Sequence, residues 1–277
     1  LSTPLYSGLT SVPTFLNTIR TVFTGLQVKS QHNAESKNYL FVDLAVNQAG
    51  TYRITLKKGK YTSKVDYTIH TRREGSRDRQ GFNSSDMIYL IMSDRFVDGD
   101  PSNNTVEGMA EACAKDNVHG RFGGDIQGII NSLDHIAALG ATAIWPTPLL
   151  EDNEAAWSYH GYACSDYYHI DPRMGTNELY REFVGKAHEK DIKVIMDVVT
   201  NHCGTSHWWM TDLPFNDWIH QFPEYTGTNI CFSTNMDFNA SKQDLHIQES
   251  GWFVPSMPDM NLNNPFVLNY FKQWAVW

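Results

Sequence analysis

The feature that most limits the possible folds of this chain is a set of three short apolar runs, each followed by an amphipathic stretch. In chain order, the six stretches cover residues 87–92, 125–140, 141–148, 177–191, 192–199 and 264–277. The apolar runs do not alternate with polar residues, which is typical of strands buried on both faces. Strand and helix in alternation predict an α/β fold with a parallel sheet or barrel. In such folds, functional residues gather at the carboxyl ends of the strands.

The amphipathic stretches have the spacing of helices. Residues 125–140 place apolar side chains at intervals of three and four residues and end at Gly140, which is a stop signal. Residues 264–277 open with Pro265, a residue favoured at the first helical position. The predicted buried face of this last helix consists of Val267, Tyr270, Phe271 and Trp274.

The loops after the three apolar runs are long. About 30 residues follow the first run, roughly 30 follow the second and roughly 60 or more follow the third. Connections of about 2–6 residues are typical of α/β units, and longer loops are usually functional or form small subdomains. Because parallel strands direct these loops to one edge of the sheet, the sequence predicts a site built from loops.

In the first quarter of the chain, the spacing of apolar residues has a different period. Residues 38–71 alternate between apolar and polar side chains on either side of the turn at Lys58-Gly59-Lys60, which predicts an antiparallel hairpin. We therefore assign residues 1–73 to an N-terminal β-sandwich-like domain, present in part. Residues 74–86 are charged and rich in Gly and Ser, so they are predicted to be a linker.

Composition excludes some partners. The net charge of −9 argues against a nucleic-acid partner, because a phosphate binder needs a basic face. No run of about 18 apolar residues is present, so a membrane span is not predicted. The four cysteines lack C-x-x-C spacing and therefore give little support to a zinc or redox site.

The segment 94–104 contains a cluster of oxygen ligands. Asp98, Asp100, Asn103 and Asn104 lie within seven residues on a loop with Gly and Pro. Calcium takes 6–8 oxygen ligands, so the cluster favours Ca²⁺, although a solvated turn rich in Asp and Asn is the competing interpretation. In Gly123-Gly124-Asp125, the carboxylate of Asp125 could join this site or simply cap the helix that follows it.

Two further segments carry polar and aromatic residues at predicted strand ends. His160 and Tyr162 lie in the second long loop, and Asp197 lies near the end of the third strand, just before His202. Aromatic faces beside imidazole donors suit a sugar-like ligand. The alternatives are Tyr rings packed on the rim of the sheet and an imidazole bonded to backbone. Aromatic residues between 207 and 252 favour a planar ligand or packing within a subdomain.

Five ordered motifs resemble the α-amylase family of glycoside hydrolases, most closely its neopullulanase and cyclomaltodextrinase branch. They are "IYLIMSDRFVDGDPSNN", "GATAIWPTP", "YHGY", "DVVTNH" and "MPDMN", and the resemblance covers residues 85–277. It implies a (β/α)8 TIM-barrel catalytic domain. Residues 87–277 would form about the first three βα units, with an inserted subdomain at about 200–263 after strand 3.

The resemblance also implies roles for individual residues. Tyr162 would stack on the sugar at the cleavage point, and His160 and His202 would bind its hydroxyls. Asp197 and Asn201 would support the site. The calcium ligands of the branch match Asp98, Asp100, Asn103, Asn104, Gly123 and Asp125. Because the branch often has Asp where this chain has Asn104, the ligand charge here is lower.

The activity implied is hydrolysis of α-glucans with retention of configuration, on starch, maltooligosaccharides, pullulan or cyclodextrins. Such enzymes use a carboxylate nucleophile and a carboxylic acid/base. The resemblance assigns no catalytic residue to this chain, because both groups are expected beyond Trp277. Asp197 and Glu151 do not replace them, since neither matches a catalytic motif. We therefore expect these residues to be part of a longer enzyme and to be inactive by themselves.

Other interpretations stay open. The protein could be a non-catalytic glucan-binding relative, whereas a metal-dependent hydrolase barrel is disfavoured because no H-x-H follows the first strand. Preference for α-1,4 or α-1,6 links is undecided. The start at Leu1 and the sandwich module favour a periplasmic or other extracytoplasmic location over a cytoplasmic one. Homodimers are familiar in the branch, so a homodimer is an expectation by resemblance alone.

Overall fold

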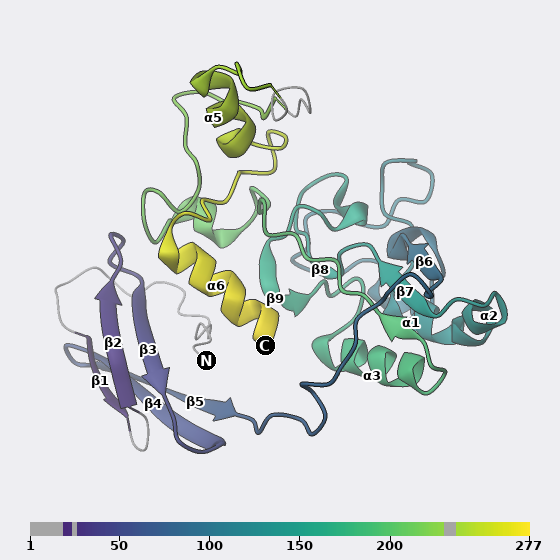
Figure 1. The fold of residues 1–277 in the computed structure, drawn as a ribbon, viewed down its shortest axis with the longest axis horizontal. Helices are drawn as coiled ribbons and strands as arrows, with labels where there is room; N and C mark the ends of the chain where they lie inside the picture. Colours follow the sequence, from purple (N-terminus) through teal and green to yellow (C-terminus); the bar gives the residue numbers. More distant parts are fainter. Residues whose placement is uncertain (1–18, 24–26, 230–236) are drawn as a thin grey trace. The chain divides into compact units, whose positions relative to one another are not determined.

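The chain divides into two units, which are described separately (Figure 1). The computed structural model describes residues 19–23, 27–229 and 237–277. The first unit contains the described residues up to Gln80 together with 213–216 and 265–277. The second unit contains residues 81–212 and the described part of 217–264.

The first unit contains two antiparallel sheets. In one, β4 (Gly50–Lys58) lies between β1 (Ile19–Phe23) and β5 (Tyr61–Ile69). In the other, β2 (Gln27–Asn33) pairs with β3 (Leu40–Ala45). The predicted hairpin is confirmed, since β4 and β5 pair from Lys58–Tyr61 to Gly50–Ile69 and Gly59 adopts a positive φ of 58° in the turn.

The alternation in sequence matches burial along this hairpin. From Ser63 to Ile69, half-buried residues alternate with exposed ones, and Ile54 of β4 is 1% exposed. The exposed face of the hairpin carries the paired side chains of Arg53 and Asp66. The sandwich-like arrangement and the boundaries at 73 and 86 stay predictions, and the part of the N-terminal domain before Ile19 lies outside the described residues.

Helix α6 (Pro265–Val276) groups with the first unit, although residues 264–277 were predicted to belong to the barrel. Its buried face is the predicted one, with Val267, Tyr270, Phe271 and Trp274 inside. Three rings explain the grouping, because Phe266 at the start of α6 lies 4.8 Å from Phe41 and 4.9 Å from Phe215 between ring centroids.

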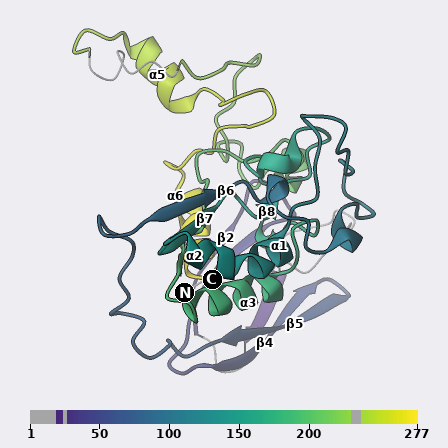
Figure 2. The ribbon, with the colours of Figure 1, turned by 90° about the vertical axis from the view of Figure 1, so that its right-hand side faces the viewer.

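The second unit is built on a parallel sheet in the order β10-β7-β6. Its strands are β6 (Ile88–Ile91), β7 (Ala143–Pro146) and β10 (Lys193–Val194). Helices α1 (Ile126–Asn131), α2 (Leu133–Ala138) and α3 (Asn177–His188) follow the first two strands (Figures 1 and 2). The predicted strand–helix alternation and the parallel pairing are therefore confirmed, and the carboxyl ends of the three strands share one edge.

Two predictions about the strands of this sheet were wrong. The third strand was predicted over 192–199, but ladder pairing ends at Val194, followed by one more bond from Ile195 N to Ile144 O. The strands are also not buried on both faces, since in β6 Ile88 is 38% exposed and Leu90 57% exposed. In a closed barrel such side chains fill the interior in layers contributed by all the strands. Three strands leave that face uncovered among the described residues.

The helix predicted over 125–140 is divided at Ser132. The Ser132 hydroxyl donates to the carbonyl oxygen of Gly128, and its backbone N–H bonds Ile129 in the tighter i to i−3 manner. A serine that bonds back to the preceding turn bends a helix, which gives α1 and α2 in place of one helix. Gly140, with φ at 83°, ends the helix as predicted.

The long loops contain short elements that the sequence did not predict. Residues between β7 and α3 form an antiparallel ribbon of β8 (Leu150–Glu151) and β9 (Asp166–Ile170). The last loop contains α5 (Lys242–Ser250), which lies away from the parallel sheet in both views (Figures 1 and 2). Among the described residues, no helix is both long and apolar enough to cross a membrane.

Candidate functional site

Asp197 joins the ends of the second and third strands. Its Oδ2 accepts hydrogen bonds from the indole Nε1 of Trp145, at 3.1 Å, and from the hydroxyl of Tyr162, at 3.0 Å. Trp145 lies in β7 and Tyr162 in the loop that follows it. Two donors on one oxygen hold this carboxylate in place, and they also orient the Tyr162 ring.

A tight turn presents His160 and Tyr162 together. Their rings lie 5.7 Å apart between centroids and are tilted by 49°. His160 Nδ1 accepts a hydrogen bond from the backbone N–H of Tyr162, so the proton of a neutral ring lies on Nε2. Gly161 between them has φ at 78°, and a Cβ there would lie 2.1 Å from the Pro148 carbonyl oxygen. Only glycine fits at this position.

Burial favours the neutral forms of His160 and Tyr162. It lowers the pKa of His160 below its ordinary value. The pKa of Tyr162 is raised to about 12, first by burial and then by the charge of Asp197. At neutral pH the Tyr162 hydroxyl therefore carries its proton and donates to Asp197.

His202 is bound inside the protein through both ring nitrogens. Nε2 lies 3.1 Å from the carbonyl oxygen of Tyr162, and Nδ1 lies 3.2 Å from the side-chain amide of Asn201. The residue is 6% exposed, and burial lowers its pKa. Its ring stacks on Phe253, with centroids 5.2 Å apart. In this arrangement His202 supports the site, and binding a sugar hydroxyl would require Nε2 to change partner.

The end of the last loop is tied to its beginning. Cys203 N donates to Pro258 O at 3.2 Å, and Met260 N donates to Asn201 O at 2.9 Å. The carboxylate of Asp259 lies 2.7 Å from Nδ1 of His220. Residues 201–203 and 258–260 therefore lie side by side, and hydrogen bonds join the two ends of the segment between them.

The structure brings the predicted calcium ligands together, but several of them form hydrogen bonds with other groups of the chain. Asp125 caps α1 through Gly128 N and also accepts from the backbone N–H groups of Gly99 and Asp100. Asp100 accepts from Ser102. Gly123, with φ at 89°, lies against Asn104, because a Cβ added there would be 2.2 Å from the Asn104 Oδ1 atom. The capping interpretation of Asp125 is confirmed.

Three side-chain oxygens of this loop are buried without a partner among the described residues. They are Oδ1 of Asp98, Asn103 and Asn104, which we call the oxygen cluster. Unpaired buried oxygens are uncommon and call for an explanation such as an ion. Carboxylate and amide oxygens are ligands that Ca²⁺ prefers, so the residues fit that ion. No group of three or more His, Cys, Asp or Glu in the described part of the chain could hold a metal by itself.

A lysine also contacts the oxygen cluster. Lys115 Nζ lies 2.8 Å from Oδ2 of Asp98, and Asn104 Nδ2 donates to the same oxygen. The hydrogen bond from Lys115, followed by that from Asn104, lowers the pKa of Asp98. The charge of this carboxylate is thus partly balanced from within the chain.

A buried cluster beside the β8–β9 ribbon was not predicted from the sequence. Arg173 is 1% exposed and binds both carboxylate oxygens of Asp171, at 2.9 Å and 2.7 Å. Its guanidinium also donates to the carbonyl oxygens of Glu111 and Asp152. We call Asp152, Asp171 and Arg173 the arginine cluster. Burial raises the pKa of Asp152 to about 8, and its Oδ2 lies 3.8 Å from His160 Nδ1.

Comparison with known families gives two matches along the chain. Residues 90–277 match the alpha amylase catalytic domain, and residues 16–73 match the cyclomaltodextrinase N-terminal domain. The first match covers β7, β10, the second half of β6 and every residue of the candidate site. The resemblance stated from the motifs is thereby confirmed.

Individual relatives agree with these matches. The chain is 38% identical over 198 residues to a beta/alpha-amylase of Paenibacillus polymyxa, a match covering 70% of this chain and 15% of that protein. It is 38% identical over 198 residues to a cyclomaltodextrinase of Thermoanaerobacter pseudethanolicus (68% and 31%) and 34% identical over 196 residues to neopullulanase 2 of Thermoactinomyces vulgaris (66% and 30%). An Anoxybacillus alpha-amylase structure superposes with a TM-score of 0.56 at 34% identity, over 69% of this chain and 37% of that one. The chain thus spans less than a third of the length of these three relatives.

Proposed function

Since this chain belongs to the alpha-amylase family, we propose that the complete gene product hydrolyses α-glucans and that these residues form one wall of its substrate site. The observation that carries the proposal is the Asp197 junction, which orients the Tyr162 ring where the strands end. A fixed aromatic face beside an imidazole N–H suits a sugar ring with hydroxyl groups. Cyclodextrins, pullulan and starch are the proposed substrates.

Within this proposal the site residues have separate tasks. Tyr162 stacks on the sugar at the cleavage point, and the Nε2 side of His160 binds a hydroxyl. Asp197 and Asn201 hold the wall in place, the latter through its contact with His202. A retaining mechanism needs two carboxylates about 5–5.5 Å apart, and the family resemblance assigns neither to residues 1–277.

Two finer features belong to the same proposal. Residues 200–263 form the inserted subdomain of the barrel, which is supported by the bonds that close its two ends. The oxygen cluster, Asp100, Asp125 and the Gly123 carbonyl would hold a calcium ion. The ion would neutralise the buried oxygens and stiffen the loop. An extracytoplasmic location and a homodimer stay predictions.

The test is the activity of the complete gene product on pullulan, cyclodextrin and soluble starch, with the anomeric configuration of the product followed by NMR. Tyr162→Phe removes the bond to Asp197 but keeps the ring, whereas Tyr162→Ala removes both. We expect the Ala variant to lose far more kcat/KM than the Phe variant. Glucan binding without released sugar would favour a non-catalytic relative, and inverted product would refute the retaining mechanism.

A further inference from the structure

The turn that carries His160 begins at a strained residue. Trp157 has φ at 68° and ψ at 12°, in the left-handed region, and its ring stacks on His119 with centroids 5.0 Å apart. Gly161, at the other end of the turn, is also left-handed, but glycine adopts this conformation freely. A bulky residue rarely does, and it persists there only where the surrounding contacts hold it.

A distant carboxylate caps this turn. Trp157 precedes the 3-10 turn Ser158–His160 and provides no side-chain cap of its own. Instead, Oε2 of Glu111 accepts hydrogen bonds from the backbone N and from Oγ of Ser158, both at 2.7 Å. The first N–H groups of a helical turn have no partner within it, and a capping oxygen satisfies them. Glu111 therefore does from 47 residues away what a neighbouring cap usually does.

Glu111 is itself held in place. Arg173 Nη1 donates to the carbonyl oxygen of Glu111 at 2.8 Å, and the N–H of the preceding Ala110 donates to Asn153 Oδ1 at 2.7 Å. The charge of Glu111 also acts on the site, because burial lowers the pKa of His160 and this charge opposes the lowering. A fixed carboxylate can hold the turn that bonds to it.

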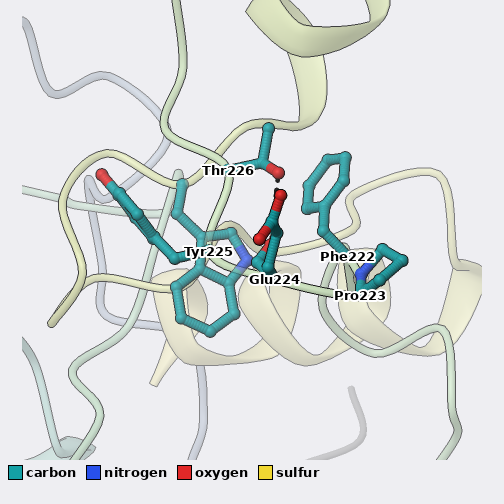
Figure 3. A pocket seen from close by; sticks show the side chains of 6 residues that line it. Phe222, Pro223, Glu224, Tyr225 and Thr226 are labelled. Carbon is teal, nitrogen blue, oxygen red and sulfur yellow. Dashed lines mark hydrogen bonds between the residues drawn. The ribbon is translucent and has the colours of Figure 1, made fainter.

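The carboxylate of Glu111 is used differently from that of Glu224. Glu224 is an exposed residue that lines a small pocket with Phe222 and Tyr225 (Figure 3). The bonds of Glu111, in contrast, are made to Ser158, which is 1% exposed. Because these bonds face the interior, Glu111 acts through them on the turn and not on a ligand.

We propose that Glu111 is a positioning residue for the glucan site, whose two bonds to Ser158 hold the strained turn and so orient His160 and Tyr162. The inference rests on the proposed function and adds a residue that acts on the site without touching the sugar. Its location in the loop after β6 means that one long loop supports the sugar-binding residues of the next.

The first experiment measures kcat/KM of the complete gene product on maltoheptaose. Glu111→Ala should lower it about ten- to hundredfold, since a misplacement of about 1 Å can cost 10²-fold. Glu111→Gln keeps an oxygen that can accept both bonds and should lose far less. Glu107→Ala, which removes an exposed carboxylate of the same loop, is the matched control and should change nothing.

Trp157→Gly separates positioning from a general loss of stability. Glycine occupies the left-handed region without strain, so the turn should depend less on the bonds from Glu111. In the Trp157→Gly background, Glu111→Ala should lower kcat/KM less than about threefold, and a double-mutant cycle measures this coupling. The same fold-loss in both backgrounds would overturn the inference.

Hydrogen exchange tests the contact directly, whether or not glucans are cleaved. Glu111→Ala should speed exchange in residues 157–163 about tenfold or more, because a hydrogen bond to a charged group is lost. Exchange in α3 should stay unchanged. If the unaltered protein neither binds nor cleaves any α-glucan, the proposed function fails. If it cleaves them and exchange in 157–163 does not respond to Glu111→Ala, only the assignment of Glu111 fails.

Discussion

The oxygen cluster and the arginine cluster both bury polar side chains in the same unit, but they satisfy them differently. In the arginine cluster, both oxygens of Asp171 accept hydrogen bonds from Arg173, and both oxygens of Asp152 accept from backbone N–H groups. In the oxygen cluster, one oxygen each of Asp98, Asn103 and Asn104 has no partner in the described residues.

The difference indicates what each cluster needs. A buried carboxylate beside a buried guanidinium is complete within the chain, and removing one partner leaves an uncompensated charge. Buried oxygens without donors are unfavourable, and a cation from solution can supply the missing partner. We therefore expect the arginine cluster to respond to mutation and the oxygen cluster to respond to metal ions.

The largest expected effect is that of Arg173→Met. Loss of the guanidinium removes the partner that bonds both oxygens of Asp171 and leaves this buried carboxylate only the looser pair with Arg121 Nη1, at 4.0 Å. Breaking a buried pair costs up to about 3–5 kcal/mol of unfolding free energy. Urea denaturation of the complete gene product measures it. Arg181→Met is the control, because Arg181 is 60% exposed in its pair with Glu178 and such pairs contribute about 0–1 kcal/mol. Equal effects of the two variants would contradict the comparison.

Removal of calcium should have the next largest effect. At a concentration one hundred times its dissociation constant, a ligand stabilises the folded state by about 2.7 kcal/mol. EGTA should therefore lower the Tm, and added Ca²⁺ should restore it, whereas Mg²⁺ should restore less. In Arg173→Met the same calcium-dependent shift should persist. A Tm that ignores both EGTA and Ca²⁺ would refute the calcium assignment.

Asn104→Asp should tighten calcium binding. A carboxylate replaces an amide whose oxygen is buried beside Gly123, which adds charge to the ligand set. We expect a roughly tenfold lower Kd, or about 1.4 kcal/mol. Calcium titration followed by calorimetry tests this, with the exposed Asn239→Asp as the control. Unchanged or weaker binding would show that Asn104 does not face the ion.

The smallest effect is expected for Lys115→Gln. Lys115 is 56% exposed, so stability without metal should change little, but loss of its charge should strengthen calcium binding. The variant also tests pH dependence. A carboxyl with a lowered pKa stabilises the fold above its ordinary pKa and loses that contribution as pH falls through the lowered value.

For Asp98 this pH window lies below its ordinary pKa of 3.8. Lys115→Gln should move the acid loss of stability to higher pH, as measured by thermal unfolding between about pH 2 and 5. Arg181→Met again provides the matched loss of one exposed positive charge. An identical acid transition in both variants would show that Lys115 does not act on Asp98.

Local patterns predicted several parts of the fold because their causes are local. Alternation along 38–71 predicted the β4–β5 hairpin, and helical spacing predicted the buried face of α6. The break at Ser132 depends on a single hydroxyl bonding back to Gly128, which apolar spacing does not reveal. The exposure of Leu90 depends on how many strands cover it, and one strand's sequence does not contain that information.

The sequence alone determined which residues reach the strand ends and which motifs they belong to, because strand periods and chain order are local properties. Only the tertiary structure decided their partners. Asp197 bonds Tyr162 and Trp145, which are 35 and 52 residues away in the sequence, and Arg173 bonds Glu111, which is 62 residues away. Such contacts depend on the register of parallel strands and the paths of long loops. They follow from packing the whole unit, in which most buried polar groups find a partner.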